Sequence, residues 1–207
     1  MHYSNVTLLI FSRAPTPGDC KTRLIPELGP HGAAQLHSKL TLHTLDTFLQ
    51  PPVCQTQLWC APDDNHPFFK QCRNNYALTL HHQPAGDLGA KMAFAVQCSL
   101  KHKPHVVIIG TDCPALTTRH LQEVIGDLEN GYDASIIPAD DGGYVLIGLN
   151  KFDDFLFNGI KWGSNQVMDQ TTRRLNHLGW IWRAHMPLWD VDRAADITRM
   201  NQAGFLL

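Results

Sequence analysis

Short apolar runs rich in β-branched residues recur along this chain, and segments with helical periodicity separate most of them. The runs predict strands at 6–11, 57–60, 78–81, 106–110, 134–138, 144–149 and 180–185. Helical spacing predicts helices at 32–49, 88–100, 118–128, 164–178 and 194–203. Strands that are apolar on both faces suit a buried, largely parallel sheet. We therefore expect a single three-layer α/β/α domain over residues 1–207, mostly parallel, with a mixed C-terminal part.

The composition limits the partners and the environment that suit the chain. A length of 207 residues favours one domain large enough to bury a substantial core. The formal net charge of −2 argues against a nucleic-acid partner, which usually requires a basic excess. No apolar run approaches the ~20 residues of a membrane-spanning helix, and the first residues, 1–5, carry no charged leader. We therefore expect a cytoplasmic protein with no membrane span and no nucleic-acid partner.

The cysteines and histidines give little support to a zinc site. The six cysteines contain no C-x-x-C pair and show no regular spacing. In a cytoplasmic chain of this size, they are expected to be free thiols. The 12 histidines form neither H-E-x-x-H nor H-x-H, so their spacing does not favour zinc.

A loop with three cations follows the first predicted strand. The cations are Arg13, Lys21 and Arg23. Pro17 stiffens the loop, and Gly18 permits backbone N–H groups to approach a ligand closely. Lysine supplies a point charge for phosphate, and arginine supplies a planar fork that binds phosphate oxygens in pairs. The loop lacks the first glycine of the G-x-x-x-x-G-K-[ST] pattern, so it is not a P-loop. A phosphate site and a surface loop with solvated charges are both open interpretations.

A carboxylate stands at the end of another predicted strand. Asp112 follows the run 106–110 within the segment G-T-D-C-P. A magnesium or manganese ion between phosphates needs hard oxygen ligands, typically one or two carboxylates. Ligands of open α/β sheets bind outside the carboxyl ends of the strands, where Asp112 and the cationic loop are expected to converge. The alternative is that Asp112 caps the following turn through a local hydrogen bond.

A segment with two glycines leads into the predicted helix 88–100. Gly86, Asp87 and Gly89 surround the start of that helix, whose free N–H groups and positive dipole end favour anions. Gln83 is a candidate to read the edge of a nucleobase. The alternative is a strand-to-helix turn that simply requires glycine, and this is the interpretation we prefer for Gly89.

Adjacent acids and glycines precede the predicted strand 144–149. A bare turn accounts for Gly142 and Gly143. It accounts less well for Asp140 and Asp141, because neighbouring like charges repel. Asp141 is a candidate to orient or deprotonate an acceptor hydroxyl. The alternative for both acids is a role as solvated turn residues.

Two acidic residues separated by one position precede the last predicted helix, 194–203. In an extended segment, Asp190 and Asp192 point to the same side, as a shared metal site requires. Asp192 is also suited to cap the N-terminus of that helix. The two roles are compatible with each other.

Five segments together resemble a known superfamily. In chain order they are P-x-P-G-x-x-K-T-R-L, Q-x-x-G-D-L-G, G-T-D-C-P, P-A-x-D-G-G-Y and a late D-x-D before a helix. This set resembles the nucleotide-diphospho-sugar transferases, which have the GT-A fold. More closely, it resembles the small bacterial family of predicted glycosyltransferases known as DUF2064. The resemblance extends over residues 6–203, and five motifs in order are far more specific than any one of them.

The resemblance implies a Rossmann-like domain that binds a nucleoside triphosphate or a nucleotide sugar, with Mg²⁺ or Mn²⁺ as cofactor. The residues that match the family motifs fall into four groups: phosphate-binding (Pro17, Gly18, Lys21, Arg23), base- or ribose-binding (Gln83, Gly86, Asp87), metal-binding (Asp112, Asp192) and acceptor-facing (Asp141, Gly142, Gly143, Tyr144, Trp162).

The sequence departs from the family patterns in three places. Arg13 stands where the family loop usually carries lysine, which keeps the charge but changes its geometry. The strand end carries Thr-Asp-Cys around Asp112 rather than the D-x-D typical of metal-dependent glycosyltransferases. The glycine-rich G-x-G-T-R loop of nucleotidyltransferases is absent as well. These departures favour a metal site divided between Asp112 and a later acid.

The leading functional prediction is metal-dependent glycosyl transfer from a nucleotide sugar to a small-molecule acceptor. In that reaction Lys21 and Arg23 would stabilise the departing phosphate, and Asp141 would act as the base. Two alternatives stay open: a guanylyl- or cytidylyltransferase that releases pyrophosphate, and a nucleotide-binding module without catalysis. The base, the sugar, the acceptor and the oligomeric state are not specified by the sequence.

Overall fold

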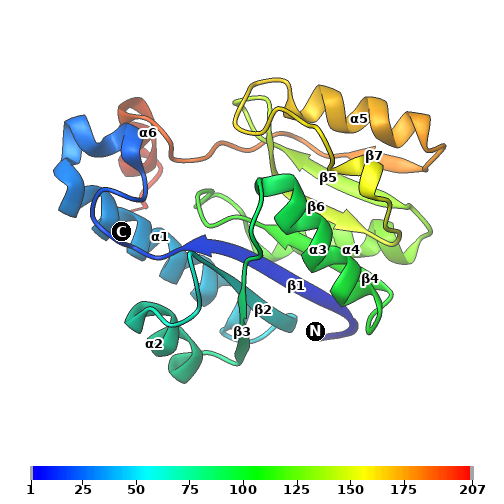
Figure 1. Ribbon diagram of the computed structural model, residues 1–207, viewed down its shortest axis with the longest axis horizontal. Coiled ribbons are helices and arrows are strands. Elements are labelled where there is room, and N and C mark those ends of the chain that lie inside the picture. Colours follow the sequence, from blue (N-terminus) through cyan, green and yellow to red (C-terminus); the bar gives the residue numbers. More distant parts are fainter. Residues whose placement is uncertain (1, 206–207) are drawn as a thin grey trace.

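A mixed sheet runs through the middle of the computed structural model, which describes residues 2–205 (Figure 1). Its strands are β1 (Tyr3–Arg13), β2 (Cys54–Ala61), β3 (Leu78–His82), β4 (His105–Ile109), β5 (Ala134–Pro138), β6 (Tyr144–Leu149) and β7 (Trp182–Ala184). Their order in the sheet is β3-β2-β1-β4-β6-β5-β7. Strand β6 is antiparallel to both β4 and β5, and every other neighbouring pair is parallel. This confirms the mostly parallel sheet with a mixed C-terminal part.

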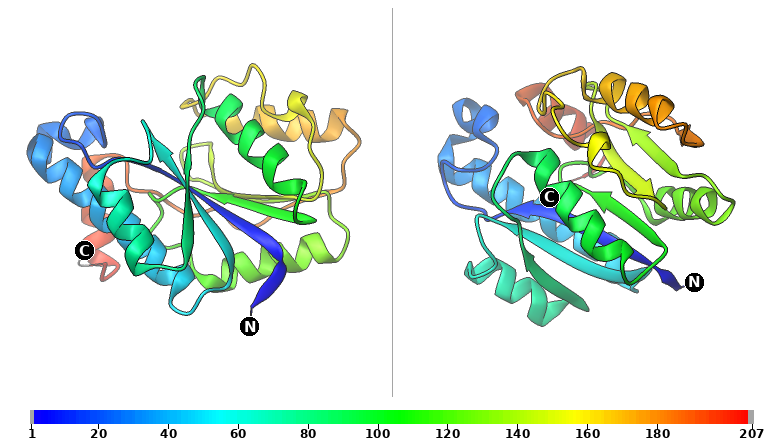
Figure 2. Two further views of the ribbon diagram at one scale, coloured as in Figure 1. Left: turned by 60° about the horizontal axis from the view of Figure 1, so that its bottom comes forward. Right: turned by 45° about the vertical axis from the view of Figure 1, so that its right-hand side comes forward.

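Helices cover both faces of the sheet, which confirms the three-layer prediction (Figure 2). Helices α1 (Ile25–Leu49), α2 (Pro67–Asn75) and α4 (Thr118–Glu129) pack on one face, and α3 (Leu88–Leu100) and α5 (Val167–His177) pack on the other. Two short 3₁₀ turns, η1 (Thr22–Leu24) and η2 (Asp154–Leu156), and a final helix, α6 (Ala194–Gln202), complete the elements.

The period-two pattern of β1 explains why this strand lies at the centre of the core. Leu8 and Ile10 belong to the cluster beneath α1, α2 and α4, whereas Leu9 belongs to the cluster beneath α3 and α5. All three side chains are fully buried, because alternate residues of a strand point to opposite faces and both faces are covered.

A third cluster joins the C-terminal segment to η1 and α1. Leu24 and Leu40 pack with Trp189, Val191 and Met200. The segment after β7 therefore crosses the molecule and places α6 beside the first part of α1 (Figure 1). This crossing carries the late acidic residues to the cationic loop.

The structure corrects several predicted boundaries. Helix α1 begins at Ile25, seven positions before the predicted start, but Gly29 interrupts it with φ 68° and the helix continues from Pro30. Helix α2 was not predicted, since its buried face consists of Phe69 and Cys72 alone. The last helices and β7 are shorter than predicted. Residue 1 of the expected N-terminal segment, and residues 206–207, lie outside the described part.

Polar side chains hydrogen-bond to backbone N–H groups at the starts of α4 and α6. Thr117 caps α4, and its side chain accepts a hydrogen bond from the backbone N–H of His120. The alternative role of Asp192 as the cap of α6 is wrong, because Arg193 occupies that position. Asp196 instead accepts hydrogen bonds from the backbone N–H groups of Asp192 and Arg193.

The reversed direction of β6 determines which loops meet. Strands β1 and β4 end at one edge of the sheet, and β6 begins at that same edge because it is antiparallel to β4. The loops that follow Arg13 and Ile109 and the turn that precedes Tyr144 therefore lie together. No helix within residues 2–205 is both long enough and apolar enough to cross a membrane.

Candidate active site

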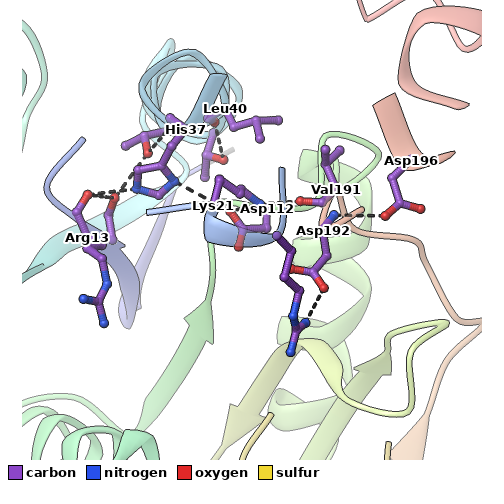
Figure 3. Close-up of polar contacts among 12 residues, drawn as sticks. Arg13, Lys21, His37, Leu40, Asp112, Val191, Asp192 and Asp196 are labelled. Atoms are coloured by element: carbon purple, nitrogen blue, oxygen red, sulfur yellow. Dashed lines mark hydrogen bonds and ion pairs between the residues drawn. The ribbon is translucent and has the colours of Figure 1, made fainter. Parts of the chain in front are cut away.

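Lys21 turns inward from the cationic loop. It adopts a left-handed backbone conformation, with φ 49° and ψ 40°, and only 4% of its side chain is exposed. Its Nζ atom lies 2.8 Å from Oδ1 of Asp112 and donates to the carbonyl oxygen of Val191 (Figure 3). The structure therefore brings the predicted phosphate lysine to the predicted metal carboxylate, and does not leave it in solvent.

His37 lies beside this ion pair and was not predicted as a site residue. Its Nε2 is 2.8 Å from the carbonyl oxygen of Arg13, and its Nδ1 is 3.9 Å from Oδ1 of Asp112 (Figure 3). A carbonyl oxygen only accepts hydrogen bonds, so Nε2 carries the proton and Nδ1 presents a lone pair. Burial lowers the pKa of His37 and keeps the ring neutral. The sequence offered little signal, because the residue lies on an apolar face of α1.

Arg13 and Arg23 are the outward-facing cations of the loop. Both residues are exposed, and a guanidinium nitrogen of Arg23 pairs with Asp192. This pairing raises the pKa of Arg23, chiefly through the hydrogen bond. Pro17 and Gly18 form an exposed turn between them, with φ 93° at the glycine. The two arginines are thus exposed at the edge of the sheet, and their contact with phosphate stays a prediction.

Asp190 lies in the electrostatic field of two other carboxylates. Burial is the main cause that raises its pKa to about 6, and the charges of Asp141 and Asp112 raise it further. The spacing of Asp190 and Asp192 is compatible with a shared metal site, whereas the family resemblance implies Asp192 alone. In the structure Asp192 is paired with Arg23, and Asp190 is the late acid whose pKa responds to the charge of Asp112.

These carboxylates suit a hard divalent cation. The charges of Asp141 and Asp112 both act on Asp190, whose pKa is about 6, and a cation near these acids would offset their repulsion. Within residues 2–205 no group of three or more His, Cys, Asp or Glu side chains is close enough to hold a metal by itself. A Mg²⁺ or Mn²⁺ ion at Asp112 would therefore need water or substrate oxygens for most of its coordination shell.

The segment predicted to lie on the base or ribose side has structural contacts of its own. Nε2 of the buried Gln83 donates to the carbonyl oxygens of Trp59, at 2.8 Å, and Ser12, at 3.3 Å. Asp87 caps α3 and accepts from the backbone N–H of Ala90. Gly86 has φ 121°. This segment follows the carboxyl end of β3, and Gln83 also contacts β1 and β2 near their ends. Contact of the segment with a nucleotide stays a prediction.

The turn that precedes β6 is tightly built. Oδ1 of Asp141 accepts from the backbone N–H of Gly143 at 2.9 Å. Gly142 has φ 91°, and a Cβ atom there would lie 2.2 Å from the carbonyl oxygen of Asn165. Only glycine fits this position. Asp140 pairs with Arg199 at 2.9 Å, which explains how two adjacent acids are tolerated.

Asp141 lines two cavities. The first, of about 200 Å³, we call the apolar cavity; it is lined by Phe11, Leu88, Met92, Ile108, Ile109, Gly110, Asp141, Gly143, Tyr144, Val145, Trp162, Gly163, Ser164 and Val167. The second, of about 210 Å³, we call the acidic pocket; it is lined by Asp140, Asp141, Trp189, Asp190, Asp192, Arg193, Asp196 and Arg199. Three of the four predicted acceptor residues other than Asp141 line the apolar cavity: Gly143, Tyr144 and Trp162.

Comparison with solved structures places this fold among known proteins. A protein from Desulfovibrio desulfuricans G20, named as a "putative nucleotide-diphospho-sugar transferase", is 28% identical, with a TM-score of 0.87 over 98% of this chain and 88% of that one. The 4-diphosphocytidyl-2C-methyl-D-erythritol synthase from Anaerococcus prevotii DSM 20548 is 12% identical, with a TM-score of 0.65 over 98% and 96% of the two chains. CMP:2-keto-3-deoxy-manno-octonic acid synthetase, in complex with CTP, is 9% identical, with a TM-score of 0.62 over 98% and 99%.

Two further comparisons concern the sequence. No curated protein matches the chain. The family described as "Uncharacterized protein conserved in bacteria (DUF2064)" matches residues 44–164, a range that includes Gln83, Asp112 and Asp141. The nucleotide-diphospho-sugar transferase likeness and this match agree with the resemblance of the five motifs. The chain belongs to the DUF2064 family.

Proposed function

We propose that the protein is a glycosyltransferase that moves a sugar from a nucleotide donor to a small-molecule acceptor, with a divalent cation. The observation that carries this proposal is the position of Asp141, which lines both the acidic pocket and the apolar cavity. A base for glycosyl transfer has to reach the acceptor on one side and the donor on the other. The 28% identical neighbour, named for nucleotide-diphospho-sugar transfer, supports the same class of donor.

The donor phosphates are assigned to the outward face of the cationic loop. Arg13 and Arg23 are exposed there, and arginine binds phosphate oxygens through two parallel N–H groups. On binding, Arg23 would exchange the carboxylate of Asp192 for a phosphate. Lys21 is already paired with Asp112. Its charge would therefore act on the phosphates from the buried side of the loop, and not as a flexible surface side chain.

The cation is assigned to Asp112 together with the late acids. Asp190 shares an electrostatic field with Asp112, and Asp192 becomes available if Arg23 turns to phosphate. When bound, the ion neutralises charge on the departing phosphate. His37 keeps its Nδ1 lone pair beside Asp112 and holds the end of β1 through the carbonyl of Arg13, which fixes the positions of both loops.

In the proposed reaction the sugar moves from the donor phosphate to the acceptor hydroxyl. The Asp141 carboxylate accepts the proton of the acceptor hydroxyl, and the acceptor oxygen forms a bond to the anomeric carbon of the sugar. The bond between that carbon and the phosphate oxygen breaks, and its electron pair leaves with the nucleoside diphosphate. Arg23 and Lys21 stabilise the negative charge that develops on this leaving group. Most of the remaining rate enhancement comes from holding acceptor and donor in line.

A thermal-shift screen tests the proposal. Nucleotide sugars and nucleoside triphosphates are added separately, with and without Mg²⁺ or Mn²⁺, because a ligand bound only to the native state raises stability by RT ln(1 + [L]/Kd). We expect a metal-dependent shift with a nucleotide sugar that disappears in Asp112→Asn. Turnover should then release a nucleoside diphosphate. Release of pyrophosphate from a triphosphate would instead establish nucleotidyl transfer, and binding without turnover would establish a nucleotide-binding module.

A further inference from the structure

The apolar cavity lies where several elements of the fold converge. Its walls come from the ends of β1 and β4, the starts of β6, α3 and α5, and the loop 162–164. It is separate from the acidic pocket, with which it shares only Asp141. A molecule in this cavity would therefore approach the donor side through the Asp141 carboxylate.

The aromatic residues of the cavity offer their rings rather than their polar atoms. The indole nitrogen of Trp162 lies against Gly89, where a Cβ atom would be only 2.4 Å from it. The hydroxyl of Tyr144 is buried beside Thr171 of α5, a residue that does not line the cavity. Both polar atoms thus face away from the cavity.

Ser164 and Asp141 are the other polar side chains of the lining, and both already make hydrogen bonds. Oγ of Ser164 donates to the carbonyl oxygen of Lys161 at 2.7 Å and accepts from the backbone N–H of Gln166 at 3.4 Å. Oδ1 of Asp141 accepts from Gly143, which leaves the second carboxylate oxygen to meet a ligand. Phe11, Met92 and the other lining side chains are hydrocarbon or thioether. A ligand with many hydroxyls would leave most of them unpaired, at a cost of about 1–3 kcal/mol each.

The volume and the charge restrict the ligand further. An apolar cavity of about 150 Å³ holds benzene, so the volume of about 200 Å³ accommodates a group of roughly eight non-hydrogen atoms by proportion. Asp141 is the charged side chain in the lining, and it repels a carboxylate or a phosphate at this depth. Sugars and sugar phosphates therefore match the cavity poorly.

We propose that the acceptor is an uncharged small alcohol with an aryl or branched-alkyl body, whose apolar body fills this cavity and whose hydroxyl meets Asp141. This inference rests on the proposed function, because only a transfer reaction makes the bound alcohol an acceptor. Binding of the alcohol itself needs no nucleotide. The apolar body excludes water around Asp141, which strengthens the hydrogen bond from the hydroxyl to its carboxylate.

The test measures binding of benzyl alcohol to the nucleotide-free protein by ligand-observed NMR. For a ligand of this size we expect a Kd of about 1 mM, with glycerol, glucose and phenyl phosphate binding at least tenfold more weakly. Leu88→Trp should weaken benzyl alcohol binding at least tenfold, because Leu88 lines the cavity yet is 43% exposed, so the larger ring can enter it without unfolding α3. Phe94→Trp is the matched control on the same helix, outside the cavity, and should change Kd by less than twofold.

The outcomes separate this inference from the proposed function. Failure of benzyl alcohol and of 3-methylbutanol to bind, equal binding of glucose, or indifference to Leu88→Trp would each overturn the apolar acceptor. A nucleotide-sugar thermal shift in the same preparation would leave the proposed function standing. Alcohol binding without any nucleotide shift would give the reverse result: an apolar alcohol site in a protein that does not use a nucleotide donor.

Discussion

The ammonium group of Lys21 lies 2.8 Å from the carboxylate of Asp112 and also donates to the carbonyl oxygen of Val191. One buried cation thus connects the loop after β1, the end of β4 and the segment before α6. Val191 completes the connection, because its backbone N–H donates to the carbonyl oxygen of Asp112 at 2.8 Å. Lys21 thereby fixes Asp112 relative to Asp190 and Asp192, which flank Val191 in the chain.

The Lys21–Asp112 pair should show strong energetic coupling. Asp112→Asn leaves a buried ammonium without its charge partner, so we expect it to destabilise the protein by about 2–4 kcal/mol. Lys21→Met removes the charge instead and should cost less. The double variant should be more stable than the sum of the two single effects by about 1–2 kcal/mol, measured by urea unfolding. Strict additivity would mean that the pair does not interact in solution.

Asp190 should make the metal-free protein less stable as pH rises. Its folded pKa of about 6 exceeds the unfolded value of about 3.9, so the folded state binds more protons between these values. The free energy of unfolding therefore falls as pH rises from about 4 to 6, by at most about 2–3 kcal/mol. In Asp190→Asn this loss should disappear, which makes the variant more stable than wild type at about pH 7.

The measurement is chemical unfolding across this pH range in the presence of a chelator, because a divalent cation would favour the charged carboxylate. Asp19→Asn is a suitable control, since Asp19 is an exposed residue of the cationic loop. An unchanged pH dependence in Asp190→Asn would show that other groups control stability in this window.

Two helical glycines should respond in opposite ways to the same substitution. A Cβ atom at Gly89 in α3 would lie 2.4 Å from the indole nitrogen of Trp162 and 2.5 Å from the carbonyl oxygen of Phe157. Gly89→Ala should therefore destabilise the protein by about 1–3 kcal/mol. A Cβ atom at Gly126 in α4 meets nothing within 4 Å, so Gly126→Ala should stabilise the protein by up to about 1 kcal/mol. Thermal unfolding of both variants gives the comparison, and equal signs would contradict it.

Asp141→Asn should separate catalysis from donor binding. As the proposed base, Asp141 should contribute about 100- to 10,000-fold to turnover, whereas the metal-dependent nucleotide shift should survive its substitution. Asp140→Asn is the neighbouring control: Asp140 pairs with Arg199 and is assigned no catalytic part, so turnover should fall only a few-fold. Full turnover in Asp141→Asn would remove the residue from the mechanism.

The sequence predicts the sheet well because its signals are local. β-branched runs bound by polar loops define the strands, and the pattern of β1 alone places Leu8 and Leu9 on opposite faces. The position of Asp112 at the sheet edge follows from the end of β4. Helix α2 was missed because its apolar face consists of two residues, Phe69 and Cys72, which is too few for a visible period.

The contacts within the site depend on long-range geometry and could not be predicted in the same way. Lys21 turns inward because of a left-handed backbone conformation and a carbonyl group 170 positions away along the chain. Asp190 and Asp192 are separated by one residue, so the sequence pattern treats them alike. Only the structure distinguishes them, because Arg23 pairs with Asp192. His37 lacked any motif, and its proximity to Asp112 depends on how α1 crosses the end of the sheet.

The segment that crosses the molecule before α6 is synthesised late, so the site is completed late in folding on the ribosome. The ribosome completes all six strands from β1 to β6 before residues 188–199 exist, so a nascent chain can assemble most of its sheet while Lys21 still lacks the Val191 carbonyl and Arg23 still lacks Asp192. The site closes only when this late segment reaches α1. A nascent chain stalled before residue 188 would therefore have most of its sheet but would lack the contacts of Val191 and Asp192 in the site.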